Sequence, residues 1–206
     1  MNAFTIAAAV STIFTGLALA SCSPGEAPGD PAETGDNPAA LFDRLSALCG
    51  QAFEGAVVSE DEVDAAFASE TLVMHVRECS DDTLRIPFHV GEDRSRTWVI
   101  TRLSDGGLRL KHDHRHEDGS EDVLTQYGGE TETPVTGLRA DFPADAESRA
   151  LFDREGIPAS MANIWTVAIE DGAYVYALNR PDRHFETRFD LSEPVTPPPP
   201  PWGAEQ

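Results

Sequence analysis

The chain has 206 residues, 40% of them hydrophobic and including ten Phe, which is enough to build one core and argues against disorder throughout. Its formal net charge of −21 argues against partners that are nucleic acids or anionic membrane surfaces, because both would be repelled.

Residues 1–21 have the features of a signal peptide. They contain no charged side chain, and their apolar run through Ala20 is too short and too rich in small residues for a transmembrane helix. The segment ends in Leu19-Ala20-Ser21-Cys22. This ending resembles the lipobox of bacterial lipoproteins, although the Lys or Arg usual near the start of such peptides is absent.

The resemblance to lipoproteins implies cleavage before Cys22 and a membrane anchor through lipid on its thiol. The alternative is an ordinary secretory peptide with an incidental cysteine. Ser23 follows the cysteine in place of Asp, which resembles the default for the outer membrane in Gram-negative cells. We therefore expect a lipid-anchored protein of the cell envelope, on the outer membrane and facing the periplasm if the cell is Gram-negative.

The mature chain divides into three parts. Residues 22–40 hold acids, Pro and Gly but no base, and this composition predicts a disordered tether. Residues 41–191 form the predicted single β-rich domain. Residues 192–206 contain five consecutive prolines, which favour an extended polyproline II tail; a proline ligand for a partner is the alternative.

Three short helices are predicted. The first spans residues 41–49, with Leu41, Leu45 and Leu48 on one stripe. The second begins at Ser59, where Glu62 completes a capping box, and it should bury Val63 and Phe67. The third spans residues 145–155 and is closed by Gly156, with Phe152 and Ile157 placed for the hydrophobic contact of a Schellman motif.

The remaining domain shows the alternation of half-buried strands. Residues 84–90 place Leu, Ile, Phe and Val at every second position, and residues 185–191 repeat this pattern. Asp105-Gly106, Asp118-Gly119 and Asp171-Gly172 separate strand-like runs, and Asp-Gly tolerates the positive φ of a tight hairpin turn. Successive strands are therefore expected to be antiparallel neighbours.

A mainly β fold follows from this pattern. About ten short antiparallel strands leave no open edge if they curl into an up-and-down barrel or a strongly curved sheet. In pattern and size the chain resembles the calycins, the lipocalin-like barrels, whose members mostly hold small apolar ligands. That resemblance implies a fold and does not by itself assign a function.

Two cysteines remain once Cys22 is assigned to the lipid. Cys49 and Cys79 form an even pair in an oxidising compartment, so a disulfide between them is predicted. It would join the first helix to the sheet. The alternatives are two buried thiols or, less favoured, a catalytic cysteine.

Residues 111–122 are charged, His or Ser at every position except Gly119. On a strand, His112, His114 and His116 share one face. With a two-residue turn at Asp118-Gly119, His116 should lie opposite Glu121. Two interpretations remain open: a hairpin that projects into water, or a site for a divalent transition metal such as zinc.

The metal interpretation uses His114, His116 and Glu121 in a trio of two imidazoles and one carboxylate. His112 and His116 are too far apart to share one ion easily, at about 13 Å by strand rise. A histidine from another strand, His75 or His89, would then complete the set.

Residues 91–96 place two acids and two arginines in a hairpin-like loop. Arg94 and Arg96 are candidates for binding the carboxylate or phosphate of a ligand, while pairing with Glu92 and Asp93 is the favoured structural role. No nucleophile elbow, glycine-rich phosphate loop or paired-cysteine zinc motif is found in the sequence, so catalysis is the least favoured class.

The sequence therefore favours a membrane-tethered β domain that binds a small ligand or a protein of the envelope. A metal-binding protein or metal-dependent enzyme centred on residues 111–122 is the second hypothesis, and a purely structural envelope lipoprotein is the third.

Overall fold

The computed structural model describes residues 40–132, 135 and 137–204, so the predicted leader, Cys22 and the tether before residue 40 lie outside the described residues. The described elements are, in chain order, α1 (Ala40–Ser46), β1 (Ala52–Val57), η1 (Glu62–Asp64), α2 (Ala65–Ala68), β2 (Leu72–His75), β3 (Glu78–Cys79), β4 (Thr83–Val90), β5 (Asp93–Arg102), β6 (Leu108–His114), β7 (Tyr127–Glu130), β8 (Arg139–Pro143), α3 (Ala146–Arg154), η2 (Pro158–Ala162), β9 (Ile164–Glu170), β10 (Ala173–Arg180) and β11 (Arg183–Val195).

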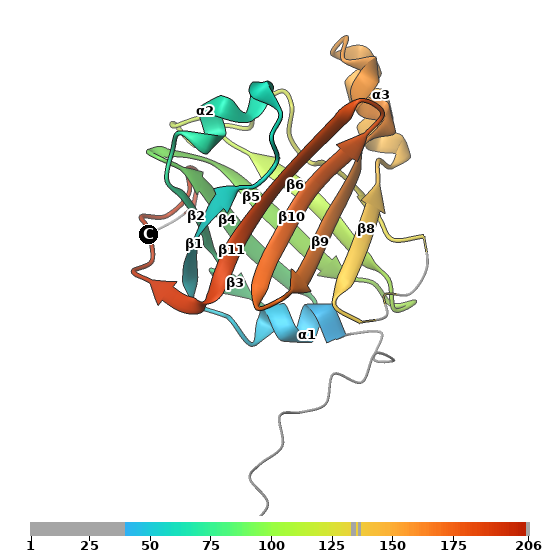
Figure 1. Ribbon diagram of the computed structural model, residues 1–206. Coiled ribbons are helices and arrows are strands. Elements are labelled where there is room, and N and C mark those ends of the chain that lie inside the picture. Colours follow the sequence, from blue (N-terminus) through green and yellow to red (C-terminus); the bar gives the residue numbers. More distant parts are fainter. Residues whose placement is uncertain (1–39, 133–134, 136, 205–206) are drawn as a thin grey trace, which may run out of the picture. The chain divides into compact units, whose positions relative to one another are not determined.

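The described strands form one 11-stranded antiparallel sheet that curls into a nearly closed barrel (Figure 1). The order is β7-β6-β5-β4-β2-β1-β11-β10-β9-β8, and β3 pairs with β4 beside this path. Most strands lie next to their neighbours in sequence; the exceptions are the pairing of β1 with β11 and the pairing of β2 with β4, because the short β3 pairs with β4 alone. The prediction of a mainly β, up-and-down barrel is therefore confirmed.

The barrel closes where β7 meets β8, through an isolated bridge between Gly129 and Ala144. A side chain at Gly129 would place its Cβ 1.8 Å from the carbonyl oxygen of Pro143, so only glycine permits this approach. The Ser148 hydroxyl of α3 accepts from the backbone N–H of Gly128 and donates to its carbonyl. Together with the backbone N–H of Asp145, which also donates to the Gly128 carbonyl, helix α3 thus supplies hydrogen-bond partners to the strand at the seam.

Helix α1 covers one end of the barrel (Figure 1). Its Leu41 and Leu45 are buried, as is Leu48 just beyond it, which confirms the predicted apolar stripe. The predicted disulfide is also confirmed: Cys49, in the turn after α1, bonds to Cys79 of β3. This end is therefore filled by apolar side chains and covalently joined to the sheet.

The second predicted helix differs at its start. Its N-cap is Asp61, whose carboxylate accepts from the backbone N–H of Val63, while the hydroxyl of Ser59 donates to Asp64. Val63 is 68% exposed, so the prediction that it is buried was wrong, whereas Phe67 packs partly buried against the core. The short 3-10 turn η1 rotates Val63 outward, because three residues per turn do not keep the facing of an α-helix.

Several local predictions are confirmed. Leu84, Ile86 and Phe88 of β4 are buried toward the barrel axis. Asp171 and Gly172 both have positive φ in the β9–β10 turn. Helix α3 ends as a Schellman motif, with the N–H of Ile157 donating to the Phe152 carbonyl at 2.9 Å.

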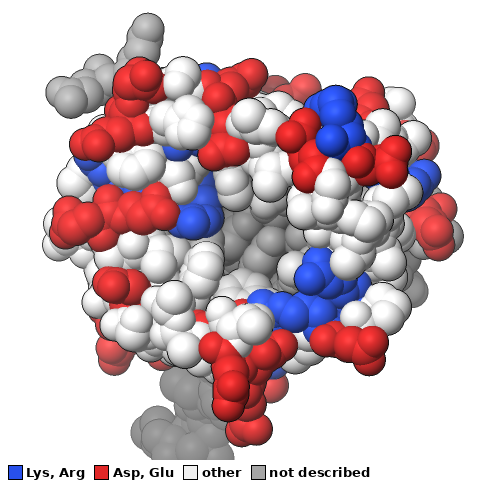
Figure 2. Space-filling model, turned by 90° about the horizontal axis from the view of Figure 1, so that it is seen from above, with Lys and Arg blue, Asp and Glu red and all other residues white. Residues whose placement is uncertain are grey.

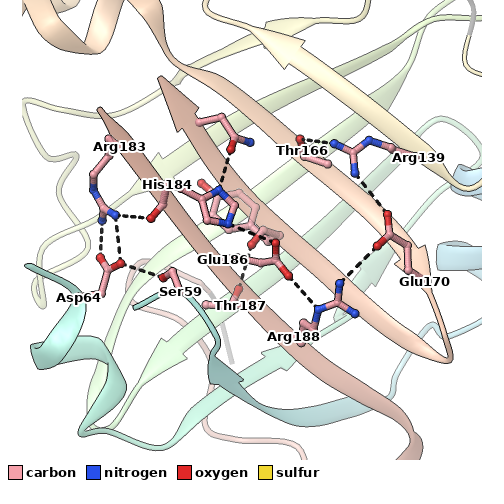
Figure 3. Close-up of polar contacts among 12 residues, drawn as sticks. Ser59, Asp64, Arg139, Thr166, Glu170, Arg183, His184, Glu186, Thr187 and Arg188 are labelled. Atoms are coloured by element: carbon pink, nitrogen blue, oxygen red, sulfur yellow. Dashed lines mark hydrogen bonds and ion pairs between the residues drawn. The ribbon is translucent and has the colours of Figure 1, made fainter. Parts of the chain in front are cut away.

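The outer faces of β8, β9 and β11 carry a row of alternating charges (Figure 3). Glu170 lies between Arg139 and Arg188, at 3.3 and 3.4 Å, and Arg188 also contacts Glu186 at 2.8 Å. All of these groups are partly exposed, so each pair contributes little to stability. The row marks this face as the solvent side of the barrel.

The proline-rich end folds back onto the barrel. Strand β11 continues to Val195, and the backbone N–H of Trp202 then donates to the Arg94 carbonyl at 3.1 Å. Pro201 and Trp202 line a cleft together with Pro87 on the outside of β4. Among the described residues, no helix is long and apolar enough to cross a membrane.

Candidate ligand-binding cavity

A cavity of about 450 Å³ lies inside the barrel, toward the end opposite α1. Figure 2 looks onto this end and shows a central hollow, with basic groups at its border and acidic groups further out. Eight aromatic side chains contribute to the wall, among them Phe88, Trp98, Tyr127, Trp165, Tyr176 and Phe185. This volume lies within the range of pockets that hold small organic ligands.

The cavity wall changes from apolar to charged along β5, β10 and β11. On β10, Tyr176, Leu178 and Arg180 face the cavity at every second position, with Arg180 at the end of the strand. On β5, Trp98 is buried and Arg96 lies nearer the start of the strand, at the same open end. The cavity therefore has an aromatic interior and a basic mouth.

The interior rings pack against one another. Trp98 stacks on Tyr176 with ring centroids 4.5 Å apart and on Phe88 at 4.7 Å. His112 stacks on Tyr127 at 4.6 Å. Such contacts between rings stabilise the arrangement of the wall beyond the burial of apolar area.

His112 is held in one neutral tautomer inside this wall. Its Nδ1 lies 3.1 Å from the carbonyl oxygen of Tyr127, which can only accept, so Nδ1 carries the proton. Its Nε2 is then an acceptor and receives the Tyr176 hydroxyl at 2.7 Å. Burial lowers the pKa of His112 to about 3, and burial raises the pKa of Tyr176 well above its ordinary value.

His114 lies nearer the mouth. Its Nε2 is 3.3 Å from the Tyr127 hydroxyl, and burial, followed by the charge of Arg96, lowers its pKa to about 4. Burial raises the pKa of Tyr127 to about 12. These rings are therefore neutral near pH 7, and they contribute polar edges without charge to the cavity.

One side of the mouth is closed by η1 and α2, which an ion pair fixes to β11 (Figure 3). The carboxylate of Asp64, 3% exposed, accepts from both guanidinium nitrogens of Arg183 and from the hydroxyl of Ser59. Asp61 adds a second carboxylate 3.4 Å from Arg183. The charge of Arg183 is thus compensated within the protein.

The other two cavity arginines differ in their partners. Arg96 pairs with Asp93 at 2.6 Å and lies over the ring of Phe67. Arg180 donates to the Ser160 hydroxyl at 3.1 Å and to the Asn163 side-chain carbonyl at 3.3 Å. Within the described part of the chain, Arg180 has no carboxylate partner.

The histidine-rich segment does not form the predicted hairpin register. Arg115 pairs with Glu121 in an isolated bridge, whereas the prediction placed His116 opposite Glu121, so the register differs by one residue. The turn spans residues 116–119. The carboxylate of Glu121 binds Arg115 at 3.2 Å, so it no longer lies opposite His116. The predicted register was therefore wrong.

The four candidate metal ligands separate in consequence. His112 and His114 face the cavity, with ring centroids 6.4 Å apart, whereas the side chain of His116 is 56% exposed and lies 4.0 Å from Asp122. No group of three or more His, Cys, Asp or Glu suited to a metal ion occurs among the described residues. The metal hypothesis thus loses the carboxylate on which it depended.

The two candidate anion-binding arginines also separate. Arg96 faces the cavity, and its predicted pairing with Asp93 is present. Arg94 instead donates to the carbonyl of Pro200 in the C-terminal segment. Sequence reasoning missed Arg180, although its period-two spacing from Tyr176 and Leu178 was a usable signal.

No protein-family model, curated protein sequence or solved structure matches the chain.

Proposed function

We propose that this protein is a lipid-anchored carrier or receptor of the cell envelope that binds a small, largely apolar ligand inside its barrel. The observation that carries the proposal is the cavity of about 450 Å³ with its aromatic wall. Barrels of about eight strands are just wide enough to be filled by side chains or to hold one small ligand, and the interior widens with strand number. The 11-stranded sheet therefore has room for a ligand, and the cavity has the size and apolar lining of ligand pockets.

The arrangement of the barrel ends supports exchange of a ligand with solvent. Helix α1 and the disulfide of Cys49 close one end, and the described chain begins there at Ala40. The mouth lies at the opposite end. A lipid on Cys22, followed by the tether predicted for residues 22–40, would hold the domain by its closed end and leave the mouth free for a ligand.

Binding of N-phenyl-1-naphthylamine, a neutral aromatic probe, tests the proposal. The probe should bind at one site per molecule, with increased fluorescence. Leu178 lies on the cavity wall, and Leu178→Glu should weaken binding at least tenfold because an apolar ligand would have to desolvate the carboxylate.

Val58→Glu is the matched control, because Val58 is 47% exposed and is not part of the cavity wall. Circular dichroism should show both variants folded. Equal affinity in the wild type and both folded variants, or no binding to the wild type, would contradict the proposal.

A further inference from the structure

Three hydrogen-bond donors converge at one side of the mouth, around Arg180. The guanidinium of Arg180 carries a charge that no described carboxylate neutralises. Its two contacts are to neutral oxygens, the Ser160 hydroxyl and the side-chain carbonyl of Asn163. These contacts orient the guanidinium and leave its charge available to a ligand.

These two hydrogen bonds use only acceptor oxygens of Ser160 and Asn163, so the donor groups of both side chains remain available. Because the Asn163 carbonyl accepts from Arg180, its side-chain amide N–H groups are donors, and they have no hydrogen-bond partner among the described residues. The Ser160 oxygen also accepts from Arg180, so its hydroxyl proton remains available. Asn163 is 6% exposed and faces the cavity together with Ser160. The amide nitrogen is not one of the buried atoms that lack a partner among the described residues, so it borders the open space of the cavity, where it can donate to an acceptor on a ligand.

The environment of Arg180 differs from that of the other two cavity arginines. Arg96 and Arg183, at the same mouth, each pair with a carboxylate. Arg180 instead lies directly above Leu178 and Tyr176 on β10. A ligand whose anionic group binds Arg180 would therefore extend its apolar body into the barrel.

We infer that Arg180, Asn163 and Ser160 form a subsite for the anionic group of the ligand, and that the ligand is an apolar organic acid. The carboxylate or sulfonate accepts from the guanidinium, the amide and the hydroxyl, and the apolar body fills the aromatic interior. This inference rests on the proposed function, because it names the chemical class that the same cavity accepts.

A matched pair of probes tests the inference: N-phenyl-1-naphthylamine and 1-anilinonaphthalene-8-sulfonate, which has the same aromatic skeleton with an added sulfonate. Arg180→Gln keeps hydrogen-bond donors near Ser160 and removes the charge. It should weaken binding of the sulfonate about tenfold to hundredfold, as expected for a charge-assisted hydrogen bond, and change binding of the neutral probe less than about threefold.

Arg139→Gln is the matched control, since Arg139 lies in the outer charge row and its side chain is 54% exposed. It should bind both probes as the wild type does. If Arg180→Gln fails to fold, Asn163→Asp provides a second test, because its carboxylate would neutralise Arg180 and repel an anion. That variant should lose the sulfonate and keep the neutral probe.

Competition against bound N-phenyl-1-naphthylamine extends the test to simple acids. Decanoate should displace the probe at a concentration at least tenfold lower than decanol does. Unchanged sulfonate affinity in folded Arg180→Gln, or equal displacement by decanoate and decanol, would overturn the inference while leaving the proposed function intact. If the wild type binds neither probe, the proposed function itself fails.

Discussion

The buried His112 predicts a specific loss of stability in acid. Its pKa lies at about 3 in the folded protein, against 6.5 for the free side chain. Because the folded state resists protonation, the unfolded state binds the proton first as the pH falls. The stability contributed by neutral His112 is therefore complete above about pH 6.5 and is lost progressively as the pH falls from 6.5 toward 3.

The magnitude follows from the two pKa values. Between pH 7.0 and 4.5, protonation of the unfolded chain at this one position lowers the free energy of unfolding by about 2.5 kcal/mol. His112→Gln removes the titrating group, and its neutral amide carries a donor and an acceptor in place of the Nδ1–H and Nε2 that contact Tyr127 and Tyr176. The variant should therefore lose about 2.5 kcal/mol less than the wild type over this pH interval, whatever its stability at pH 7.0.

Urea unfolding at both pH values, followed by tryptophan fluorescence, measures this difference. Trp98 and Trp165 are both buried, so their emission reports unfolding of the barrel. His116→Gln is the control, because that side chain is 56% exposed, and it should lose as much stability as the wild type. Equal losses in the wild type and His112→Gln would refute the reasoning.

Three further predictions concern the seam, the disulfide and the anchor. Gly129→Ala should lower the free energy of unfolding by at least about 2 kcal/mol, because its Cβ would lie 1.8 Å from the Pro143 carbonyl oxygen; an unchanged urea midpoint would contradict the described seam. Replacing Cys49 and Cys79 with Ser should cost about 3 to 4 kcal/mol, because the bond closes a loop of 30 residues. Unreduced, denatured wild type should take up no alkylating label at either position, and labelling of both would disprove the disulfide. Cys22→Ser should release the protein from membranes or leave it unprocessed, and an intact mass showing cleavage elsewhere with no acyl chain would end the lipoprotein hypothesis.

Short-range patterns determined much of the fold. The alternation at Leu84, Ile86 and Phe88 sets which face of β4 is buried, since a strand exposes opposite faces at successive residues. The Asp171-Gly172 turn and the Gly156 stop of α3 are equally local, because each depends on positive φ that few residues tolerate. The disulfide was predictable from the number of cysteines, because only two remain once Cys22 is assigned to the lipid.

The histidine-rich segment shows where local reasoning failed. Its residues allow two turns that differ by one position, and the sequence alone does not choose between them. In the folded protein, Arg115 binds Glu121 and Asp113, and His112 binds Tyr176 on a distant strand. The two contacts of Arg115 are local to the segment, whereas the contact of His112 with Tyr176 exists only after the barrel forms.

The candidate anion subsite likewise depended on the tertiary structure. The sequence places Arg180 in phase with Tyr176 and Leu178, but it cannot bring Ser160 and Asn163 of the η2 region beside that strand end. The sequence also does not indicate that Arg96 and Arg183 pair with carboxylates while Arg180 does not. Pattern along the chain thus fixed which side chains face inward, whereas closure of the barrel decided which of them meet, because contacts between distant segments depend on the path of the whole chain.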